Sequence, residues 1–453
     1  MLSQLLTIAR NTFVESVRQP IFFIIIALAG LCLLGTTWSA GFSMGMTESG
    51  EVSGDNKLLL DVGMATVFVC GMLLAAFLAT AVISREIDNK TVLTVVSKPV
   101  SRVTLVLGKF AGVAGAIFIA SITMSVFLLL CLRHEVMSTA ADEVDGPVVF
   151  LSLLAIGVSL AVAIWCNFFY GWVFPQTATL LLFPLILLAY LGVLLISKRW
   201  EIQPPGTNFK PQITIAALSI VMAHLVLTAI ATAASARLGQ VMTLVVCCGA
   251  FMLGMLSNHF LGKRAMDNQF VGLIGAADPG LDDQRTLDQN GDIYNITLEF
   301  DPRRQLNAGL PFYYGPNPNG FDLAVPPFEP YKGSLTELGE LGDRTLPPAL
   351  VITGSLGTGK SLKVQRVGAD RPLVHRAPMA GDYVFLAPTR YNFLALAAWA
   401  AVPNVQFFWL VDAISQDQPV PGRHLGLVVL YGSCQVGVFL SLAVVLFQRR
   451  EVG

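Results

Sequence analysis

Charged residues are scarce in this sequence. Asp, Glu, Lys and Arg together make up 13% of the 453 residues, whereas about a quarter is usual for soluble proteins. Hydrophobic residues make up 54%, so the composition excludes an ordinary soluble protein and indicates a polytopic membrane protein. Lys and Arg stand in short clusters beside apolar runs and form no single basic face, so we expect no nucleic-acid partner.

Cysteine is missing from the long polar segment 262–390, and all seven cysteines of the chain lie in apolar runs. This distribution excludes a disulfide framework and a Cys-rich metal site. The five histidines lack the spacing of metal ligands, and no Ser/His/Asp or Cys/His set falls on one face. We therefore expect no metal centre and no hydrolase site in this chain.

Long apolar runs are what the sequence has in abundance. A membrane helix needs roughly 20 mostly apolar residues, and eight runs meet this criterion: 21–44, 62–83, 110–132, 148–172, 178–196, 213–236, 241–261 and 424–447. A ninth run, 391–414, is interrupted by Pro403-Asn404 and ends near Asp412. Because proline breaks a helix, we interpret it as a re-entrant or interfacial segment and not as a crossing. No cleavable signal is visible before the first run, so we expect that span to direct insertion.

The distribution of basic residues predicts the orientation. With a cytoplasmic N-terminus and eight crossings, the inner segments hold Arg10, Arg18, Arg85, Lys90, Lys98, Arg102, Lys109, Arg237, Arg449 and Arg450. This excess follows the positive-inside rule. We expect a multi-pass protein of the cell (inner) membrane with both termini in the cytoplasm and 262–390 outside. Lys198-Arg199 and Lys263-Arg264 lie on the outer side, against this bias.

The polar segment 262–390 contains short alternating runs bounded by turn residues, at 294–300, 349–353, 361–367 and 382–386. Such runs predict strands. The expected fold is an all-α polytopic membrane protein with an inserted, mainly-β soluble domain. Its parts would be an amphipathic cytoplasmic helix (1–20), spans one to seven (21–261), the extracytoplasmic domain (262–390), and a re-entrant segment with the final span and a cytoplasmic tail (391–453).

Within this domain, Gly354-Ser-Leu-Gly-Thr-Gly359-Lys360-Ser361 matches the phosphate-loop pattern. A working phosphate loop opens a helix whose N–H groups hold the phosphates, yet residues 362–365 alternate like a strand. We favour a glycine-rich hairpin turn, and nucleotide binding remains the alternative. Residues 288–292 likewise resemble the start of a calcium loop but lack its Gly at position six and its closing Glu, and we interpret them as a turn.

Residues 84–109 join two spans and are basic and helix-forming. Ile87, Thr91 and Val95 share one stripe, Pro99 ends the helix, and Ser101 is placed to cap a second helix. Such a helix–break–helix suits docking into a groove on a partner protein. The alternative is a basic loop that contacts anionic lipid headgroups.

These residues resemble a known family, the permease subunits of type-2 ABC exporters. The resemblance lies in Ser84-Arg85-Glu86-Ile87, Thr91, Ser97-Lys98-Pro99-Val100-Ser101-Arg102 and Gly108-Lys109, which follow the second span. Residues 9–22 look like the family's amphipathic entry helix, with Glu15 and Arg18 in the matching places and able to pair at i, i+3. Residues 402–414 and 430–453 are similar to its re-entrant stretch and closing span. The span pair 148–172 and 178–196 and the domain 262–390 depart from its six-span pattern.

The resemblance implies that a separate ABC ATPase docks on Arg85, Glu86, Ile87, Lys90, Thr91, Lys98, Pro99, Arg102 and Lys109. It further implies that two permeases, identical or paralogous, assemble with two ATPases. ATP and Mg would then be bound by the ATPase and no cofactor by this chain. The resemblance also implies that this chain has no catalytic residue and is not an enzyme. The lipid bilayer and an extracytoplasmic protein that contacts 262–390 are further expected partners. The alternatives are a non-transporting membrane scaffold and a nucleotide-binding protein that uses Gly354, Gly359, Lys360 and Ser361.

Overall fold

The computed structural model describes residues 2–39, 54–88, 101–137, 143–280, 287–318, 320, 323, 331, 341–356, 360–370, 376–415, 420 and 422–448. The chain forms two compact units. The membrane unit comprises Met1–Met255 and Pro403–Gly453, and the inserted unit comprises Leu256–Val402. Each unit has its own hydrophobic core.

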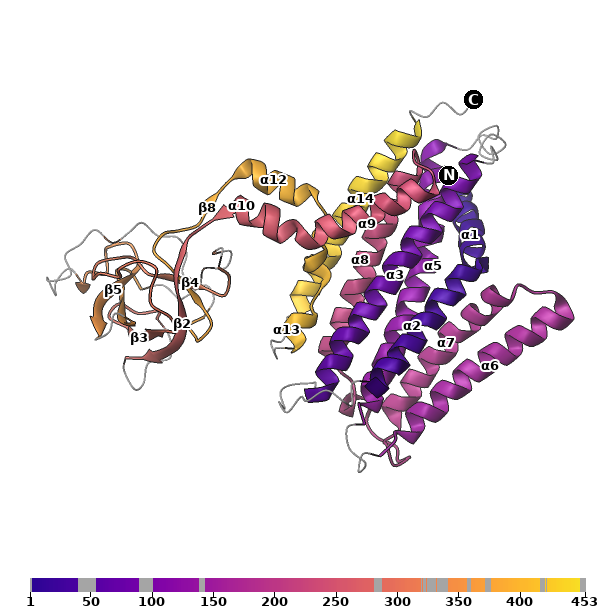
Figure 1. Cartoon of the computed structure of the whole chain (residues 1–453), viewed down its shortest axis with the longest axis horizontal. Helices are drawn as coiled ribbons and strands as arrows, with labels where there is room; N and C mark the ends of the chain where they lie inside the picture. Colours follow the sequence, from indigo (N-terminus) through magenta and orange to yellow (C-terminus); the bar gives the residue numbers. More distant parts are fainter. Residues whose placement is uncertain are drawn as a thin grey trace. The chain divides into compact units, whose positions relative to one another are not determined.

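The membrane unit is helical (Figure 1). Its helices are α1 (Leu2–Arg18), α2 (Pro20–Ser39), α3 (Gly54–Asp88), α5 (Arg102–His134), α6 (Gly146–Tyr170), α7 (Phe174–Leu195), η2 (Pro205–Thr207), α8 (Pro211–Ser235), α9 (Gln240–Ser257), η4 (Val405–Phe408), α13 (Val411–Ser415) and α14 (Gly422–Gln448). Within the described parts of the chain, eight helices are long and apolar enough to cross a membrane. They coincide with the eight predicted runs, so the predicted fold class is confirmed.

Local signals set the ends of these helices. Asp145 caps α6 by accepting a hydrogen bond from the Val148 N–H, Pro147 occupies its first turn, and Gly171 ends it with φ +66°. Proline fits the first turn because its missing N–H would be unpaired there in any case, and glycine adopts positive φ at little steric cost. These residues explain why the helix begins and ends where it does.

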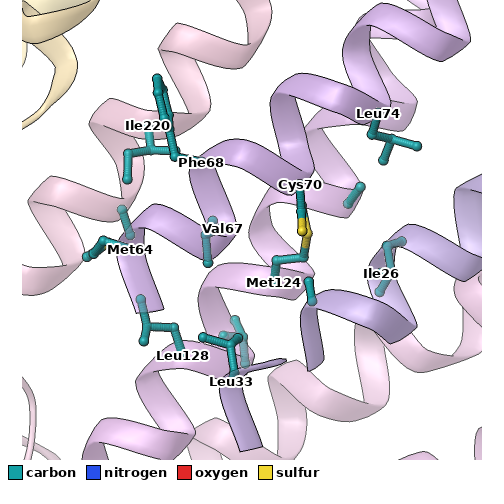
Figure 2. Packing of buried hydrophobic residues seen from close by; sticks show 14 of the residues in the cluster. Ile26, Leu33, Met64, Val67, Phe68, Cys70, Leu74, Met124, Leu128 and Ile220 are labelled. Atoms are coloured by element: carbon teal, nitrogen blue, oxygen red, sulfur yellow. The ribbon is translucent and has the colours of Figure 1, made fainter. Parts of the chain in front are cut away.

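Three spans form the centre of the membrane unit. The spans of α3, α5 and α8 are 67%, 67% and 72% buried, whereas those of α6 and α14 are 22% buried. Figure 2 shows residues of this core: Met64, Val67 and Leu74 of α3 belong to one cluster with Ile26 and Leu33 of α2, Met124 and Leu128 of α5 and Ile220 of α8. In a membrane such contacts stabilise the bundle by van der Waals packing, since lipid is as apolar as the side chains.

The inserted unit contains a six-stranded antiparallel sheet in the order β4-β7-β2-β3-β6-β5. The strands are β2 (Phe270–Pro279), β3 (Ile293–Leu298), β4 (Tyr313–Gly315), β5 (Ala349–Leu356), β6 (Ser361–Val367) and β7 (Tyr383–Phe385). All four runs predicted as strands are confirmed by β3, β5, β6 and β7. A separate pair, β1 (Met266–Asp267) with β8 (Arg390–Tyr391), closes the base of the unit.

Short helices adjoin this base. The π-helical turn η3 (Asn258–Gly262) and α10 (Lys263–Ala265) precede β1, and α12 (Phe393–Ala401) follows β8 and packs alongside them (Figure 1). The run 391–414 is therefore not one continuous helix: α12 ends before Pro403, and η4 and α13 follow separately. This agrees with the predicted interruption, while its insertion into the membrane stays a prediction.

Candidate functional site

The predicted docking segment is described at its two flanks. Arg85, Glu86 and Ile87 lie on the last turns of α3, and Arg102 and Lys109 lie on α5. Residues 84–88 thus continue α3 and do not start a separate short helix as predicted, because the helical hydrogen-bond ladder runs on past the apolar stretch. Lys90, Thr91, Lys98 and Pro99 lie outside the described residues.

Ser101 caps α5 as the sequence predicts. Its Oγ accepts a hydrogen bond of 3.1 Å from the Thr104 N–H. This bond satisfies one of the N–H groups that a helix start leaves without a partner. The second helix of the docking segment is therefore continuous with a membrane span, and a displacement of its first turn would be carried into the bundle.

The guanidinium of Arg102 reaches the end of α14. Its Nη1 donates hydrogen bonds to the carbonyls of Gln448 (2.9 Å) and Phe447 (3.5 Å). Arg237, which follows α8, donates from Nε to the carbonyl of Leu446 at 3.0 Å. Cations are favourable at a helix C-terminus because its last carbonyls are unpaired and carry partial negative charge. Two arginines, one on α5 and one in the turn after α8, thus contact the end of α14.

An apolar cluster lies beside these arginines. We call it the helix-end cluster; its residues are Leu105 and Val106 of α5, Ala233 and Ala236 at the end of α8, Ala443, Val444, Leu446 and Phe447 of α14, and Ile8 of α1. It brings together the ends of four helices next to the docking segment. Sequence reasoning counted Arg237 only as an inner charge and missed its contact with α14, although its position just after a span was a usable signal.

The predicted entry helix, α1, packs directly on α5. A Cβ at Gly112 would lie 2.5 Å from the Ala9 carbonyl oxygen, and a Cβ at Gly108 would lie 2.8 Å from Ile8 Cγ2. The two glycines therefore permit close backbone approach, as small residues do between membrane helices. Thr12, Ser16 and Val17 of α1 are buried, whereas Leu2 at its start is 73% exposed.

The two polar residues predicted to pair on α1 have other partners in the structure. Arg18 donates from Nε to Gln176 Oε1 on α7 at 2.7 Å, and among the described residues its guanidinium forms no ion pair with Glu15. Glu15 lies close enough to Lys109 of α5 to act on it electrostatically. Lys109 is 7% exposed. α1 is thus linked to α7 by a hydrogen bond and to α5 by an electrostatic interaction, which the i, i+3 spacing could not reveal.

A buried polar contact joins the three central spans. His224 of α8 is fully buried; its Nδ1 lies 2.7 Å from Ser121 Oγ of α5, and its Nε2 lies 3.0 Å from the Phe68 carbonyl of α3. Because a carbonyl only accepts, Nε2 carries the proton, and in the neutral ring the Ser121 hydroxyl donates to Nδ1. The imidazole of His224 thus connects three spans by hydrogen bonds across the helices.

The phosphate-loop match lies in a β-hairpin. β5 runs through Gly354 to Leu356, and β6 begins at Ser361 and pairs with it antiparallel, in the register Leu356↔Ser361. Gly359 lies outside the described residues. Lys360 forms an ion pair with Asp301, Nζ to Oδ1 3.3 Å. A strand follows the motif where a phosphate loop needs a helix, so no helix N-terminus is present to hold phosphates.

No group of three or more His, Cys, Asp or Glu side chains is placed to hold a metal ion in the described part of the molecule. At the loop that resembles a calcium site, Asp292 Oδ2 accepts from the Gln289 N–H at 2.9 Å, and Asp370 accepts from the Asn290 N–H. These carboxylates stabilise the turn itself, in agreement with its prediction as a turn.

Comparison with known proteins gives one family. Residues 6–170 match the family described as ABC-2 family transporter protein, a region that includes most of α1, both flanks of the docking segment, and α6. The match thus takes in one of the two spans that we counted as additional to the family pattern. No curated protein matches the chain.

Proposed function

We propose that this chain, whose residues 6–170 match the ABC-2 transporter family, is a permease driven by a separate ATPase that docks on residues 84–109. The family is a membrane transport component and not itself catalytic, and it implies an ABC ATPase and membrane lipid as partners. ATP and Mg would be bound by the ATPase, and two permeases, as identical copies or as paralogues, would assemble with two ATPases.

The observation that carries this proposal is the connection between the docking segment and the bundle. The segment continues into α5. Arg102 joins the first turn of α5 to α14, and Gly108 and Gly112 let α1 pack closely against α5. A push on the segment would therefore move α5, α1 and the end of α14 together. Rigid movement of packed helices between two arrangements is how transporters alternate access.

The arrangement of the chain ends supports the proposed orientation. Ile8 of α1 and Phe447 of α14 lie in the same helix-end cluster, so both described ends of the chain are at one end of the membrane unit (Figure 1). A chain that crosses the membrane an even number of times must have both of its ends on the same side. Together with the excess of Lys and Arg there, it favours cytoplasmic termini in the cell (inner) membrane and an extracytoplasmic segment 262–390.

The first experiment is mass spectrometry of the proteins that co-purify with the tagged chain from its own membranes in mild detergent. We expect a stoichiometric ABC ATPase. Its reproducible absence, with the chain intact, would favour the non-transporting scaffold.

The second experiment locates the docking surface. Glu86→Lys should abolish co-purification of the ATPase and leave membrane insertion intact, because a reversed charge on the docking surface repels the groove that accepts it. Glu201→Lys is the matched control, since Glu201 is exposed and lies between α7 and α8, at the other end of the spans. Normal binding and stimulation of the ATPase by Glu86→Lys would overturn the docking assignment.

A further inference from the structure

A cavity of about 730 Å³ opens at the base of the inserted unit. Its walls come from η3, α10 and the β1–β8 pair, and they include Phe260, Lys263, Arg264, Arg390 and Tyr391. The volume lies within the roughly 300–1,000 Å³ that is usual for small-molecule sites. The pairing of β1 with β8 brings residues near 264 and near 390 together, although more than a hundred residues separate them in the chain.

The cavity has an excess of positive charge. Lys263, Arg264 and Arg390 contribute three cations, and Asp267 contributes a carboxylate. Asp267 and Arg390 are neighbours in the strand register, yet none of these four side chains forms an ion pair within the described residues. Charges left in this way are open to a ligand of opposite sign, and guanidinium groups match the geometry of phosphate oxygens well.

The position of the cavity along the membrane span places it at headgroup level. The seventh candidate span runs over Gln240–Ala265, which is 26 residues. At 1.5 Å per residue it is about 39 Å long, and the hydrocarbon core measures about 30 Å. A span centred on the core would extend about 4.5 Å beyond it at each end, which is about three residues. Lys263 and Arg264, in the last three residues of the span, would then stand at the edge of the hydrocarbon core, next to the headgroups.

The neighbouring helix α12 also indicates that the cavity lies at the level of the lipid headgroups. It consists of apolar residues, FLALAAWAA, and none of them is buried; Phe393 and Leu394 are 78% and 85% exposed. It packs alongside η3 and α10, and Tyr391 stands just before it. Exposed apolar helices and aromatic residues of this kind are typical of the interface between lipid tails and water.

We infer that this cavity binds the headgroup phosphate of an anionic phospholipid through Lys263, Arg264 and Arg390. A lipid is the occupant that fits, because the cations stand beside an apolar helix at the end of a membrane span, where acyl chains lie next to the headgroup layer. The inference accounts for Lys263-Arg264, which run against the positive-inside bias. It does not depend on the proposed ATPase coupling.

The test is native mass spectrometry of the full chain in detergent with dioleoyl phosphatidylglycerol or dioleoyl phosphatidylcholine. We expect the wild-type chain to retain phosphatidylglycerol preferentially. The triple variant Lys263→Gln, Arg264→Gln, Arg390→Gln should bind it about a hundredfold more weakly, since each cation near an anionic lipid favours binding by roughly fivefold. The control variant Arg304→Gln, Arg344→Gln, Lys363→Gln removes the same charge from exposed positions outside the cavity and should bind normally.

A further variant tests the assignment without removing a cation. Asp267→Asn should strengthen binding of phosphatidylglycerol, because it removes the cavity's carboxylate. The proposal would be overturned if the wild-type chain retained the two lipids equally. It would also be overturned if the control variant lost as much affinity for phosphatidylglycerol as the triple cavity variant. Displacement of phosphatidylglycerol by inorganic phosphate would also overturn it, because the site would then bind a soluble anion.

Discussion

Arg102 Nη1 donates a hydrogen bond of 2.9 Å to the carbonyl oxygen of Gln448, a residue 346 positions further along the chain. The first turn of α5 and the last turn of α14 are therefore held together beside the docking segment. Arg102 was predicted from the sequence to contact a partner protein, and the structure gives it a contact within the chain. This contact leads to the first prediction.

Replacement of Arg102 by Gln should loosen the end of α14. The variant removes a cation from unpaired helix carbonyls, an interaction that contributes about 1 kcal/mol. We expect faster hydrogen exchange in the peptide that covers the last turn of α14, measured by mass spectrometry. Arg10→Gln, which removes an exposed cation from α1, should leave that peptide unchanged. Unchanged exchange in Arg102→Gln would show that the hydrogen bond does not hold this helix end.

Gly112→Ala should displace α1 from α5. The new methyl group would lie 2.5 Å from the Ala9 carbonyl oxygen and 2.9 Å from the Phe13 nitrogen, and overpacking of this kind costs about 1–3 kcal/mol. The measurement is thermal unfolding of the detergent-purified chain. Gly157→Ala on α6 is the control, because nothing lies within 4 Å of its added Cβ. Equal stability of the two variants would contradict close packing of α1.

His224→Ala should destabilise the bundle by about 3 kcal/mol, since it leaves a cavity and removes the hydrogen bonds to Ser121 and Phe68. A double-mutant cycle with Ser121→Ala, followed by thermal unfolding, measures the coupling between the two side chains. Ser125→Ala is the control, because Ser125 Oγ has no hydrogen-bond partner in the described structure. Additive effects of His224→Ala and Ser121→Ala would rule out a direct interaction.

Asp145→Asn should lower the free energy of unfolding by about 3–5 kcal/mol, because it leaves the buried Arg133 without its counterion. This pair lies at the end of the membrane unit away from the docking segment. Arg133 Nη1 lies 2.7 Å from Asp145 Oδ2, and the two side chains are 9% and 0% exposed. Thermal unfolding of the purified chain measures the loss. Glu143→Gln removes a nearby exposed carboxylate and should have little effect on stability. If Glu143→Gln lost as much stability as Asp145→Asn, the effect would come from the overall charge of this region and not from the buried ion pair.

Lys360→Ala should leave nucleotide binding unchanged. Lys360 is paired with Asp301 beside a β-hairpin, and no helix N-terminus follows the motif. Titration of the purified chain with a fluorescent ATP analogue should show no saturable binding before or after the substitution. Saturable binding that Lys360→Ala abolishes would instead support the nucleotide-binding alternative.

The sequence by itself determined the eight spans, four of the strands and the cap of α5. A membrane span satisfies its backbone hydrogen bonds within one segment, and its length is set by the bilayer, so each apolar run could be recognised alone. Alternation identified β3 and β6 in the same way. Ser101 could be recognised as a cap because its partner, Thr104, is three residues away.

Only the tertiary structure decided the partners of Arg102, Arg237, His224 and Arg133, the buried face of α1, and the convergence of Arg264 with Arg390. These contacts join residues on different elements, and no periodicity within one segment records which element will lie opposite. A lone arginine after a span can extend into solvent, contact lipid or hold another helix end. The choice among these depends on which helices pack side by side, which follows from side-chain shape across the whole bundle and not from the local pattern of residues.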